Sequence, residues 1–442
     1  MAKEPSFFHA IQIDTDSCTG CTSCMSACPT EAIRIRNGKA VIYENRCVDC
    51  GECYNDCPVG AIKVAQDDFH LLDNYEYKVA LVPAVFIGQF DDTYKTKEIY
   101  ACLKMLGFTH IYEVEHSVEF IAGLYKKYMA EHPEIKTFIS PYCPAVIRLI
   151  QVRFPSLVDN IIKLKSPLDA ASQIIFKKLR EIGAPENKIG IFYVTPCAAK
   201  IASAKSPVSM QNTHITGVIN MDFLYNKVKL MLKQQKCKDA EPINHDLTDR
   251  SVLWPLTGGE SANFNDSVYA IDGLYNALDF LENLEDEKID APGLIEMRLC
   301  DQSCVGGILT VQNRFVAKRR LENRSKLLAR IRRGDDHAQQ NFDTPEYQDL
   351  AELMRIPDIK PRSLFKLDDN LVTALEMAEK IKDTEAKLPS INCCACGAPS
   401  CSALAEDIIR GEACLENCIF AHKDINELYD KMEDIWGKVV KL

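Results

Sequence analysis

Two cysteine runs near the N-terminus constrain this chain more than any other feature of its sequence. Each run has the spacing Cys-x2-Cys-x2-Cys-x3-Cys-Pro, and the two runs together are Cys18, Cys21, Cys24, Cys28, Cys47, Cys50, Cys53 and Cys57. At these offsets each 4Fe-4S cluster takes three thiolates from one run and the fourth from the other. The spacing therefore predicts two clusters, one held by Cys18, Cys21, Cys24 and Cys57, and one held by Cys47, Cys50, Cys53 and Cys28.

Zinc sites and disulfides are the alternative uses of clustered cysteines. The eightfold match, with Pro29 and Pro58 in place, favours iron–sulfur clusters. The pattern resembles the signature of bacterial two-cluster ferredoxins. That resemblance implies a ferredoxin-like α+β domain over residues 1–66 that carries single electrons.

The length and the cysteine content point to a multidomain protein of a reducing compartment. A chain of 442 residues is too long for one core. Most of its 20 cysteines fall in clusters, which indicates metal ligation more than a disulfide framework. No segment approaches 18 uninterrupted apolar residues, and the N-terminus lacks the apolar core of a signal peptide. We expect a cytoplasmic protein without a membrane span.

The formal net charge of −11 argues against nucleic acid as the main partner. One stretch departs from this average, because residues 314–333 hold nine Lys or Arg and a single acid, Glu322. Its apolar positions have a helical period. The stretch is either a docking face for an acidic partner or, as the charge balance favours, a basic surface helix.

Residues beyond the ferredoxin-like domain alternate between strand and helix patterns. Strands are predicted over Lys136–Ile139, Lys188–Val194 and Leu294–Leu299, and a helix over Ala170–Ile182. This rhythm predicts two α/β lobes over residues 75–325. A charged linker with helices follows over residues 326–364, and a small, mainly α domain over residues 365–442.

Four single cysteines lie in the three loops that follow these predicted strands. They are Cys143, Cys197, Cys300 and Cys304. Loops at the carboxyl ends of parallel strands converge on one crevice, so four thiolates could meet there around one cluster. The alternative is that buried single cysteines act as small hydrophobic residues.

At these loops the chain resembles the iron-only (FeFe) hydrogenase family over about residues 77–311. By position, the resemblance implies that the four cysteines hold the 4Fe-4S part of an H-cluster. Cys304 would also bridge to a diiron subsite carrying CO, cyanide and a dithiolate, and Lys200 would hydrogen-bond a cyanide. Further matches are Glu296, Gly306-Gly307 and Thr257-Gly258-Gly259.

The departures from the family pattern concern proton transfer. Tyr142 stands where catalytic members have a proton-relay cysteine, and a phenol with a pKa near 10 is a poorer relay than a thiol near 8.5. Ser203 replaces a glutamate, Arg298 a methionine and Val146 a tryptophan. These changes predict slow hydrogen turnover, with Cys304, Lys200 and Tyr142 at the reacting centre, and resemble the sensory hydrogenases of the family.

Three functions follow from this resemblance. The first is slow oxidation of H2 or reduction of protons in a sensing role, with a signalling partner protein. The second is an ordinary catalytic hydrogenase coupled to a redox partner such as ferredoxin, with Tyr142 or water carrying protons. The third is an iron–sulfur scaffold or electron-transfer protein without the diiron subsite. The sequence leaves a homodimeric assembly open.

The C-terminal part carries one more cysteine constellation. Its predicted ligands are Cys393, Cys396, Cys401 and Cys418, and Cys394 and Cys414 lie beside them as alternatives. The spacing resembles a small 4Fe-4S domain of electron-transfer complexes and corrinoid proteins. Zinc is the alternative metal. We expect a third iron–sulfur domain, closed by a helix over Asp424–Lys441.

Overall fold

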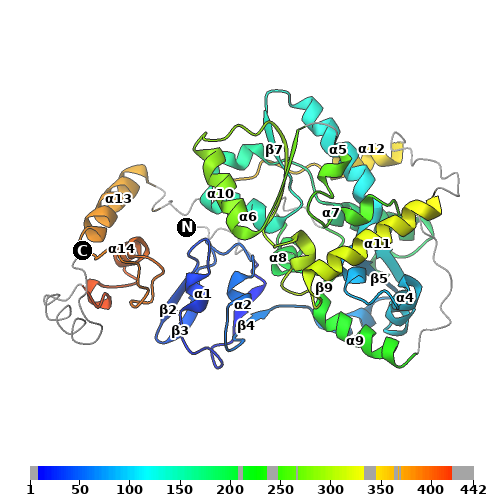
Figure 1. Cartoon of the computed structure of the whole chain (residues 1–442), viewed down its shortest axis with the longest axis horizontal. Helices are drawn as coiled ribbons and strands as arrows, with labels where there is room; N and C mark the ends of the chain where they lie inside the picture. The colour runs from blue at the N-terminus through cyan, green and yellow to red at the C-terminus, as the bar shows by residue number, and fades with distance from the viewer. Residues whose placement is uncertain are drawn as a thin grey trace. The chain divides into compact units, whose positions relative to one another are not determined.

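The computed structural model describes residues 8–207, 213–235, 247–264, 267–332, 345–362, 367 and 370–420 (Figure 1). The chain divides into two compact units. The large unit comprises Met1–Ile11, Val48–Gly51 and Val64–Pro361, and the small unit comprises Gln12–Cys47, Glu52–Lys63 and Arg362–Leu442. The predicted helix over Asp424–Lys441 lies outside the described residues.

The first lobe of the large unit is built on a parallel sheet with the strand order β6-β5-β8-β9. Its strands are β5 (Tyr77–Val82), β6 (His110–Glu113), β8 (Ile189–Thr195) and β9 (Gly217–Asn220). Strands β5 and β8 are apolar on both faces because helices cover the sheet. Helix α7 (Pro167–Glu181) packs on β8, and α4 (Thr96–Met105) and α9 (Met221–Lys233) pack on each other.

The second lobe has a three-stranded parallel sheet in the order β10-β11-β7. Its strands are β7 (Thr137–Ile139), β10 (Val268–Asp272) and β11 (Gly293–Arg298). Helices α6 (Pro144–Arg153) and α10 (Leu274–Glu285) supply the apolar side chains that close this core. The predicted two-lobed α/β architecture agrees with these sheets, and the mixed α/β class is confirmed.

The remaining helices of the large unit surround these sheets. They are α3 (Ala84–Gly88), α5 (Val118–Glu131), α8 (Ala198–Lys205), α11 (Arg314–Arg332) and α12 (Pro345–Leu353). Helix α11, drawn in yellow in Figure 1, packs against α3. None of the helices in the described ranges is both long and apolar enough to cross a membrane.

The predicted linker over residues 326–364 differs from the structure. Its first residues belong to α11, which is continuous across residue 325. Beyond α12, Met354 and Ile359 are buried, and the Lys165 N–H donates to the Met354 carbonyl at 2.7 Å. Apolar residues of this segment are therefore buried in the large unit. Its charged residues had led us to predict an exposed linker.

The small unit combines short strands with cysteine-bearing loops. Strands β2 (Ile33–Arg36) and β3 (Lys39–Ile42) form an antiparallel hairpin, closed by Asn37 and Gly38 with φ of 50° and 71°. Positive φ at both positions is typical of the tight Asn-Gly hairpin turn. Strand β1 (Ile11–Ile13) pairs with β4 (Ile62–Val64). The helices are α1 (Ser23–Ser26), α2 (Glu52–Asn55), α13 (Leu371–Glu385) and α14 (Cys401–Ile409).

Candidate metal centres

The structure brings together the four cysteines predicted to meet in the large unit. Cys143 directly precedes α6 after strand β7, and Cys197 directly precedes α8 after β8. Cys300 follows β11, and Cys304 lies in the short helix Ser303–Gly306. Burial raises the pKa of Cys300 well above its ordinary value, and nearby Cys197, Cys143 and Cys304 raise it further.

The chemistry of this thiol set fits an iron–sulfur cluster. Burial, together with the charges of Cys304 and Cys143, raises the pKa of Cys197 to about 11, although Lys200 opposes the shift. Thiols with a raised pKa, such as those of Cys197 and Cys300, become stable thiolates only when a cation neutralises them. We propose Cys143, Cys197, Cys300 and Cys304 as ligands on this basis.

Glycines allow the third cysteine loop to pack tightly against itself and the second loop. A Cβ atom on Gly306 would lie 2.0 Å from the Asp301 oxygen, and one on Gly307 would lie 2.5 Å from the Pro196 oxygen. The Leu309 N–H also donates to the Pro196 carbonyl at 3.0 Å. Both positions require glycine, because the neighbouring backbone is too close for a side chain. This close approach holds the Cys304 loop against the Cys197 loop.

Glu296 on β11 organises the loop that contains Thr257-Gly258-Gly259. Its buried carboxylate accepts from the Gly258 N–H at 3.0 Å and from the N–H and hydroxyl of Ser261 at 2.8 and 2.7 Å. This loop in turn holds the third cysteine loop, because the Cys304 N–H donates to the Pro255 carbonyl at 3.1 Å. Glu296 thus acts as a positioning residue.

Lys200 is buried beside Cys304. Its Nζ donates to the Cys304 Sγ at 3.5 Å and lies 4.6 Å from the centre of the Tyr142 ring. Burial alone would lower the pKa of Lys200, but the charges of Cys304, Tyr142 and Cys197 outweigh it and raise the pKa well above its ordinary value. Lys200 therefore supplies a permanent positive charge and N–H donors beside Cys304.

Tyr142 is buried between two cationic side chains. The Arg298 Cζ lies 4.2 Å from the centre of its ring, and the Cys304 thiol donates to the Tyr142 hydroxyl at 3.8 Å. Burial and Cys304 raise the pKa of Tyr142 well above its ordinary value, against the effects of Lys200 and Arg298. The phenol is therefore held in its neutral form, able to donate a hydrogen bond to a Cys304 thiolate.

Arg298 forms a buried ion pair that the sequence did not reveal. Its Nη2 lies 2.6 Å from Glu260 Oε2, and both residues are at most 1% exposed. Arg298 is also 3.8 Å from Glu296. Glu260 lies 38 positions earlier in the chain, directly after Thr257-Gly258-Gly259, and the spacing of the two residues does not predict the pair, which only the tertiary fold identifies.

Glu115 is a second residue that sequence reasoning missed. Its Oε1 accepts from the Ala84 N–H at 2.8 Å, whereas its buried Oε2 has no hydrogen-bond partner among the described residues. Burial and the neighbouring Glu113 raise the pKa of Glu115 to about 8. Burial raises the pKa of Tyr193, and the charges of Glu115 and Cys304 raise it as well, whereas Lys200 lowers it. Glu115 and the central site therefore both act electrostatically on Tyr193.

Two departures from the family pattern occupy ordinary positions in helices. Val146 is completely buried in the core of the second lobe, on α6. Ser203 is half-buried on α8, three residues after Lys200. Neither residue supplies a carboxyl group or a ring NH to the central site.

The N-terminal cysteines of the small unit gather in the two predicted sets. Burial, together with the charges of Cys18, Cys21 and Cys57, raises the pKa of Cys24 to about 11. Burial also raises the pKa of Cys53, with contributions from Cys47 and Cys28. Backbone N–H groups point at the sulfurs, for example from Ala40 to Cys18 at 3.4 Å and from Ala32 to Cys28 at 3.2 Å. Such donors suit sulfurs that carry negative charge.

Of the eight N-terminal cysteines, Cys50 is the one that lies in the large unit, in its segment Val48–Gly51. It packs against the core of the second lobe. The preceding Asp49 is buried and accepts from the Ala10 N–H at 2.9 Å and from Arg148 Nη1 at 2.5 Å. Since Arg148 lies on α6, the loop of Cys50 is tied to the helix that begins after Cys143.

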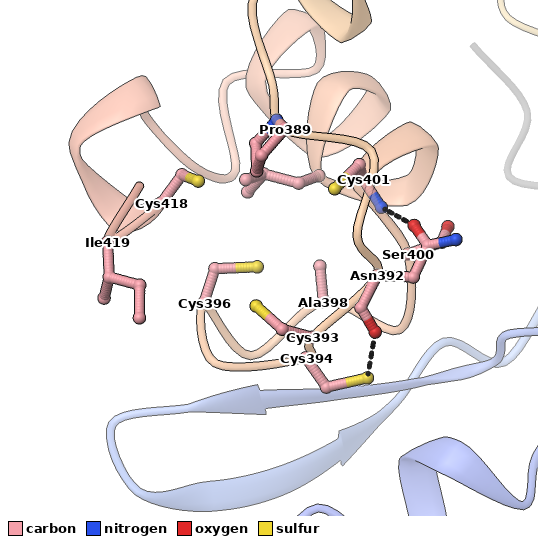
Figure 2. A pocket seen from close by; sticks show the side chains of 11 residues that line it. Pro389, Asn392, Cys393, Cys394, Cys396, Ala398, Ser400, Cys401, Cys418 and Ile419 are labelled. Atoms are coloured by element: carbon pink, nitrogen blue, oxygen red, sulfur yellow. Dashed lines mark hydrogen bonds between the residues drawn. The ribbon is translucent and has the colours of Figure 1, made fainter. Parts of the chain in front are cut away.

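The C-terminal cysteines form a third site in the small unit. Figure 2 shows the sulfurs of Cys393, Cys396, Cys401 and Cys418 pointing toward one another in a pocket closed by Pro389, Ala398 and Leu404. Cys394 turns away and donates to the Asn392 carbonyl at 3.5 Å, and Cys414 donates to the Asn417 side chain at 3.3 Å. We therefore propose the four converging cysteines as ligands, in preference to Cys394 and Cys414.

Three family models match parts of the three regions that contain the cysteine sites. Residues 77–265 match the family described as iron-only hydrogenase large subunit, C-terminal domain. Residues 17–62 match the 4Fe-4S dicluster domain. Residues 388–420 match the FeS family, which describes a candidate Fe–S cluster.

Two curated relatives match parts of the chain. The NADP-reducing hydrogenase subunit HndD of Solidesulfovibrio fructosivorans is 26% identical over 196 residues, which is 41% of this chain and 30% of HndD. Ferredoxin-2 of Desulfomicrobium norvegicum is 42% identical over 33 residues, 8% of this chain and 56% of the ferredoxin. The chain thus spans less than two thirds of the length of either relative.

Among solved structures, a variant of the FeFe-hydrogenase HydA1 from Chlamydomonas reinhardtii superposes with a TM-score of 0.49 at 12% identity, covering 67% of this chain and 98% of that one. The HydA(deltaEFG) structure gives a TM-score of 0.49 at 13% identity, covering 66% and 98%. Residues 77–265 of this chain are thus similar to the iron-only hydrogenase large subunit, and they are flanked by two regions that match iron–sulfur families.

Proposed function

We propose that this protein is a hydrogen-reactive redox protein with slow turnover, whose role is to report hydrogen. The observation that carries the proposal is the buried Lys200 Nζ at 3.5 Å from Cys304 Sγ, inside a set of four converging cysteines. A lysine is not needed to hold a 4Fe-4S cluster, since thiolates alone do that. Its presence favours an additional anionic group next to Cys304.

That group would be a diiron subsite bearing cyanide, which supplies the metal at which hydrogen reacts. Lys200 would donate hydrogen bonds to its anionic ligands, because a buried cation is stabilised by such partners. Cys304 would hold the subsite and the cluster together. Tyr142 and the buried Arg298 would close this side of the site and exclude water.

Slow turnover follows from the residues that surround Cys304. Tyr142 is a neutral phenol whose pKa is raised by burial, so it gives up its proton reluctantly. Arg298 is paired with Glu260 and keeps its proton. An efficient proton relay needs a group with a pKa near the working pH, which neither residue offers.

The iron–sulfur domains supply the electron path. Hydrogen oxidation releases two electrons and two protons, and 4Fe-4S clusters accept electrons one at a time. We infer that the N-terminal clusters carry these electrons away from the central site, toward a redox or signalling partner protein. The tie between Asp49 and α6 supports this direction, since it holds the loop of Cys50 beside the helix that follows Cys143.

Exposure of the anaerobically matured protein to H2 tests this proposal. We expect electron paramagnetic resonance to show reduction of the clusters, together with a turnover rate far below that of efficient hydrogenases. Rapid turnover would remove the sensing role. Clusters that stay oxidised under H2, yet are reduced by dithionite, would remove hydrogen chemistry altogether.

A catalytic hydrogenase is the second candidate, and Glu115 favours it. This carboxyl group has a pKa of about 8 and an unpartnered oxygen, which are properties of a group that can exchange protons near neutral pH. If Glu115 carries protons for rapid catalysis, a Glu115→Gln variant should lose most of a high activity. A slow enzyme that is equally slow with Gln at this position supports the sensing role.

A further inference from the structure

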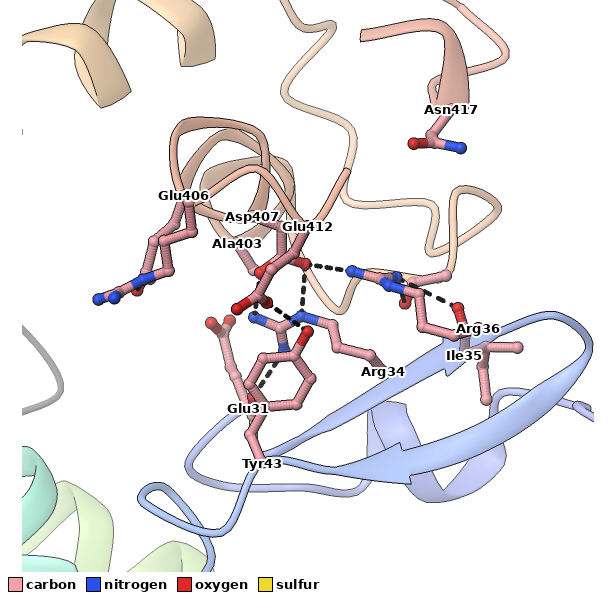
Figure 3. Close-up of polar contacts among 12 residues, drawn as sticks. Glu31, Arg34, Ile35, Arg36, Tyr43, Ala403, Glu406, Asp407, Glu412 and Asn417 are labelled. Atoms are coloured by element: carbon pink, nitrogen blue, oxygen red, sulfur yellow. Dashed lines mark hydrogen bonds and ion pairs between the residues drawn. The ribbon is translucent and has the colours of Figure 1, made fainter. Parts of the chain in front are cut away.

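The C-terminal cysteine site is attached to the β2–β3 hairpin by a buried ionic network (Figure 3). Asp407 on α14 accepts from Arg34 Nε at 2.7 Å and from Arg36 Nη2 at 2.6 Å. Arg34 and Asp407 are at most 1% exposed. Removing one partner from such a group leaves a buried charge uncompensated, so the loss of either residue would destabilise this contact.

Further polar contacts extend the network on both sides of Asp407. Arg46 lies 2.5 Å from Glu406, the residue before Asp407, and Tyr43 donates to Glu412 at 2.5 Å. The residues paired in this way are more than 350 positions apart in the chain. The contact therefore joins two segments that the sequence presents as separate iron–sulfur domains.

A backbone hydrogen bond places a cluster-binding loop directly on the hairpin. The Ile35 N–H donates to the carbonyl of Gly397, which follows Cys396, at 2.9 Å. A Cβ atom on Gly397 would lie 2.3 Å from the Ile35 oxygen, and Gly397 has a φ of +79°. Glycine is thus required here by both the close approach and the backbone conformation.

The opposite edge of the same hairpin touches an N-terminal cysteine. Ile35 is paired with Ala40 across the hairpin, and the Ala40 N–H donates to the Cys18 sulfur at 3.4 Å. Neighbouring strands are about 5 Å apart. Two hydrogen bonds and one strand spacing therefore separate the Gly397 carbonyl from the Cys18 sulfur.

We propose that the C-terminal iron–sulfur site exchanges electrons directly with the N-terminal site of Cys18, Cys21, Cys24 and Cys57, and that Asp407 is the residue that holds the two in register. Each step moves one electron, so one site is oxidised from 1+ to 2+ while the other is reduced from 2+ to 1+. No further reactant is needed. The proposal rests on the iron–sulfur assignment of both sites and not on hydrogen chemistry at Cys304, so either can fail alone.

Magnetic coupling between the two sites is the test, measured by low-temperature electron paramagnetic resonance on the full-length, dithionite-reduced protein. We expect the wild-type spectrum to contain splitting or fast relaxation that disappears in Cys418→Ala, which lacks the C-terminal site, and in Cys21→Ala, which lacks the Cys18 site. Asp407→Asn should lose the coupling while keeping its iron. Asp383→Asn, at an exposed aspartate of α13 outside this network, is the matched control and should resemble the wild type.

Two results would overturn the proposal. One is a wild-type spectrum equal to that of Cys418→Ala plus one independent cluster, and the other is survival in Cys21→Ala of the splitting or relaxation that Cys418→Ala loses. If Asp407→Asn loses iron, Arg36→Gln provides the second variant, because Arg36 is one of the two partners of Asp407 and is 25% exposed. Undiminished coupling in an iron-replete Asp407→Asn or Arg36→Gln variant would remove Asp407 as the positioning residue.

Discussion

The Nζ of Lys200 lies 3.5 Å from the sulfur of Cys304, and both side chains are buried. Each residue follows the carboxyl end of a strand in a different sheet, since Lys200 lies on α8 after β8 and Cys304 lies in the short helix after β11. The contact therefore joins the two lobes within the large unit. It also combines a thiol that we propose as a metal ligand with a charge that a simple iron–sulfur cluster does not need.

Replacement of Tyr142 by cysteine should increase hydrogen turnover. A thiol between Lys200 and Arg298 ionises more readily than a phenol there, and general acid–base groups contribute roughly 10²–10⁴-fold to rates. We expect a gain of at least about tenfold in an H2 oxidation assay. Tyr142→Ser, which has a similar volume to cysteine without a titratable thiol, is the control. Equal rates in the two variants would show that proton transfer at this position does not limit turnover.

Replacement of Arg298 by methionine, the residue of the family pattern, should destabilise the protein. The change leaves the Glu260 carboxylate buried without its 2.6 Å partner, which typically costs about 3–5 kcal/mol. The double variant Arg298→Met with Glu260→Gln should recover much of this loss. Anaerobic chemical denaturation measures both. An Arg298→Met variant as stable as the double variant would argue against the ion pair as a structural element.

The iron content of C-terminal variants should identify the fourth ligand of that site. Cys418→Ala should lose about four irons per chain, because one 4Fe-4S cluster would be missing. Cys414→Ala and Cys394→Ala should keep their iron, since those thiols donate hydrogen bonds to Asn417 and Asn392. Loss of iron from Cys414→Ala, with normal iron in Cys418→Ala, would exchange the two assignments.

Glu115 should make stability depend on pH. Its pKa is about 8 in the folded protein against 4.5 as the ordinary value, so the folded state binds more protons between these pH values. Stability should therefore fall as the pH rises from about 4.5 to 8 and then level off, with a slope of at most about 1.4 kcal/mol per pH unit.

The Glu115→Gln variant removes this dependence, so its melting temperature should exceed that of the wild type above pH 8 and change less between pH 5 and 8. Glu119→Gln, on the neighbouring helix α5, is the comparison. If both variants show the wild-type pH profile, Glu115 is charged in the folded protein, and its pKa is not raised.

Local spacing made the cysteine sites predictable, while long-range contacts did not follow from it. The runs from Cys18 to Cys57 and the loops of Cys143, Cys197 and Cys300 are recognisable because iron–sulfur ligation requires particular offsets and strand ends. Partners of Arg298 and Arg34 lie tens to hundreds of positions away, and the motifs near Glu260 and Asp407 do not predict these pairings. Only the packing of the folded chain identifies such pairs.

The burial of part of the predicted linker also depends on long-range contacts, and for that reason the local sequence did not predict it. Met354 and Ile359 are buried apolar residues in a short segment that also holds charged residues and Pro357, and such a mixture resembles an exposed connection. They are buried because the Lys163–Lys165 backbone offers hydrogen bonds to this segment. A sequence carries no local signal for the edge against which a segment will dock.

Infrared spectroscopy of the anaerobically matured protein tests the central claim most directly. If the site of Lys200 and Cys304 holds a diiron subsite, the spectrum will contain stretching bands of metal-bound CO and cyanide, and the cyanide bands will shift in Lys200→Met. Absence of these bands in protein that carries about sixteen irons, enough for four 4Fe-4S clusters, would contradict the account. The chain would then be an iron–sulfur scaffold or electron-transfer protein with a hydrogenase fold.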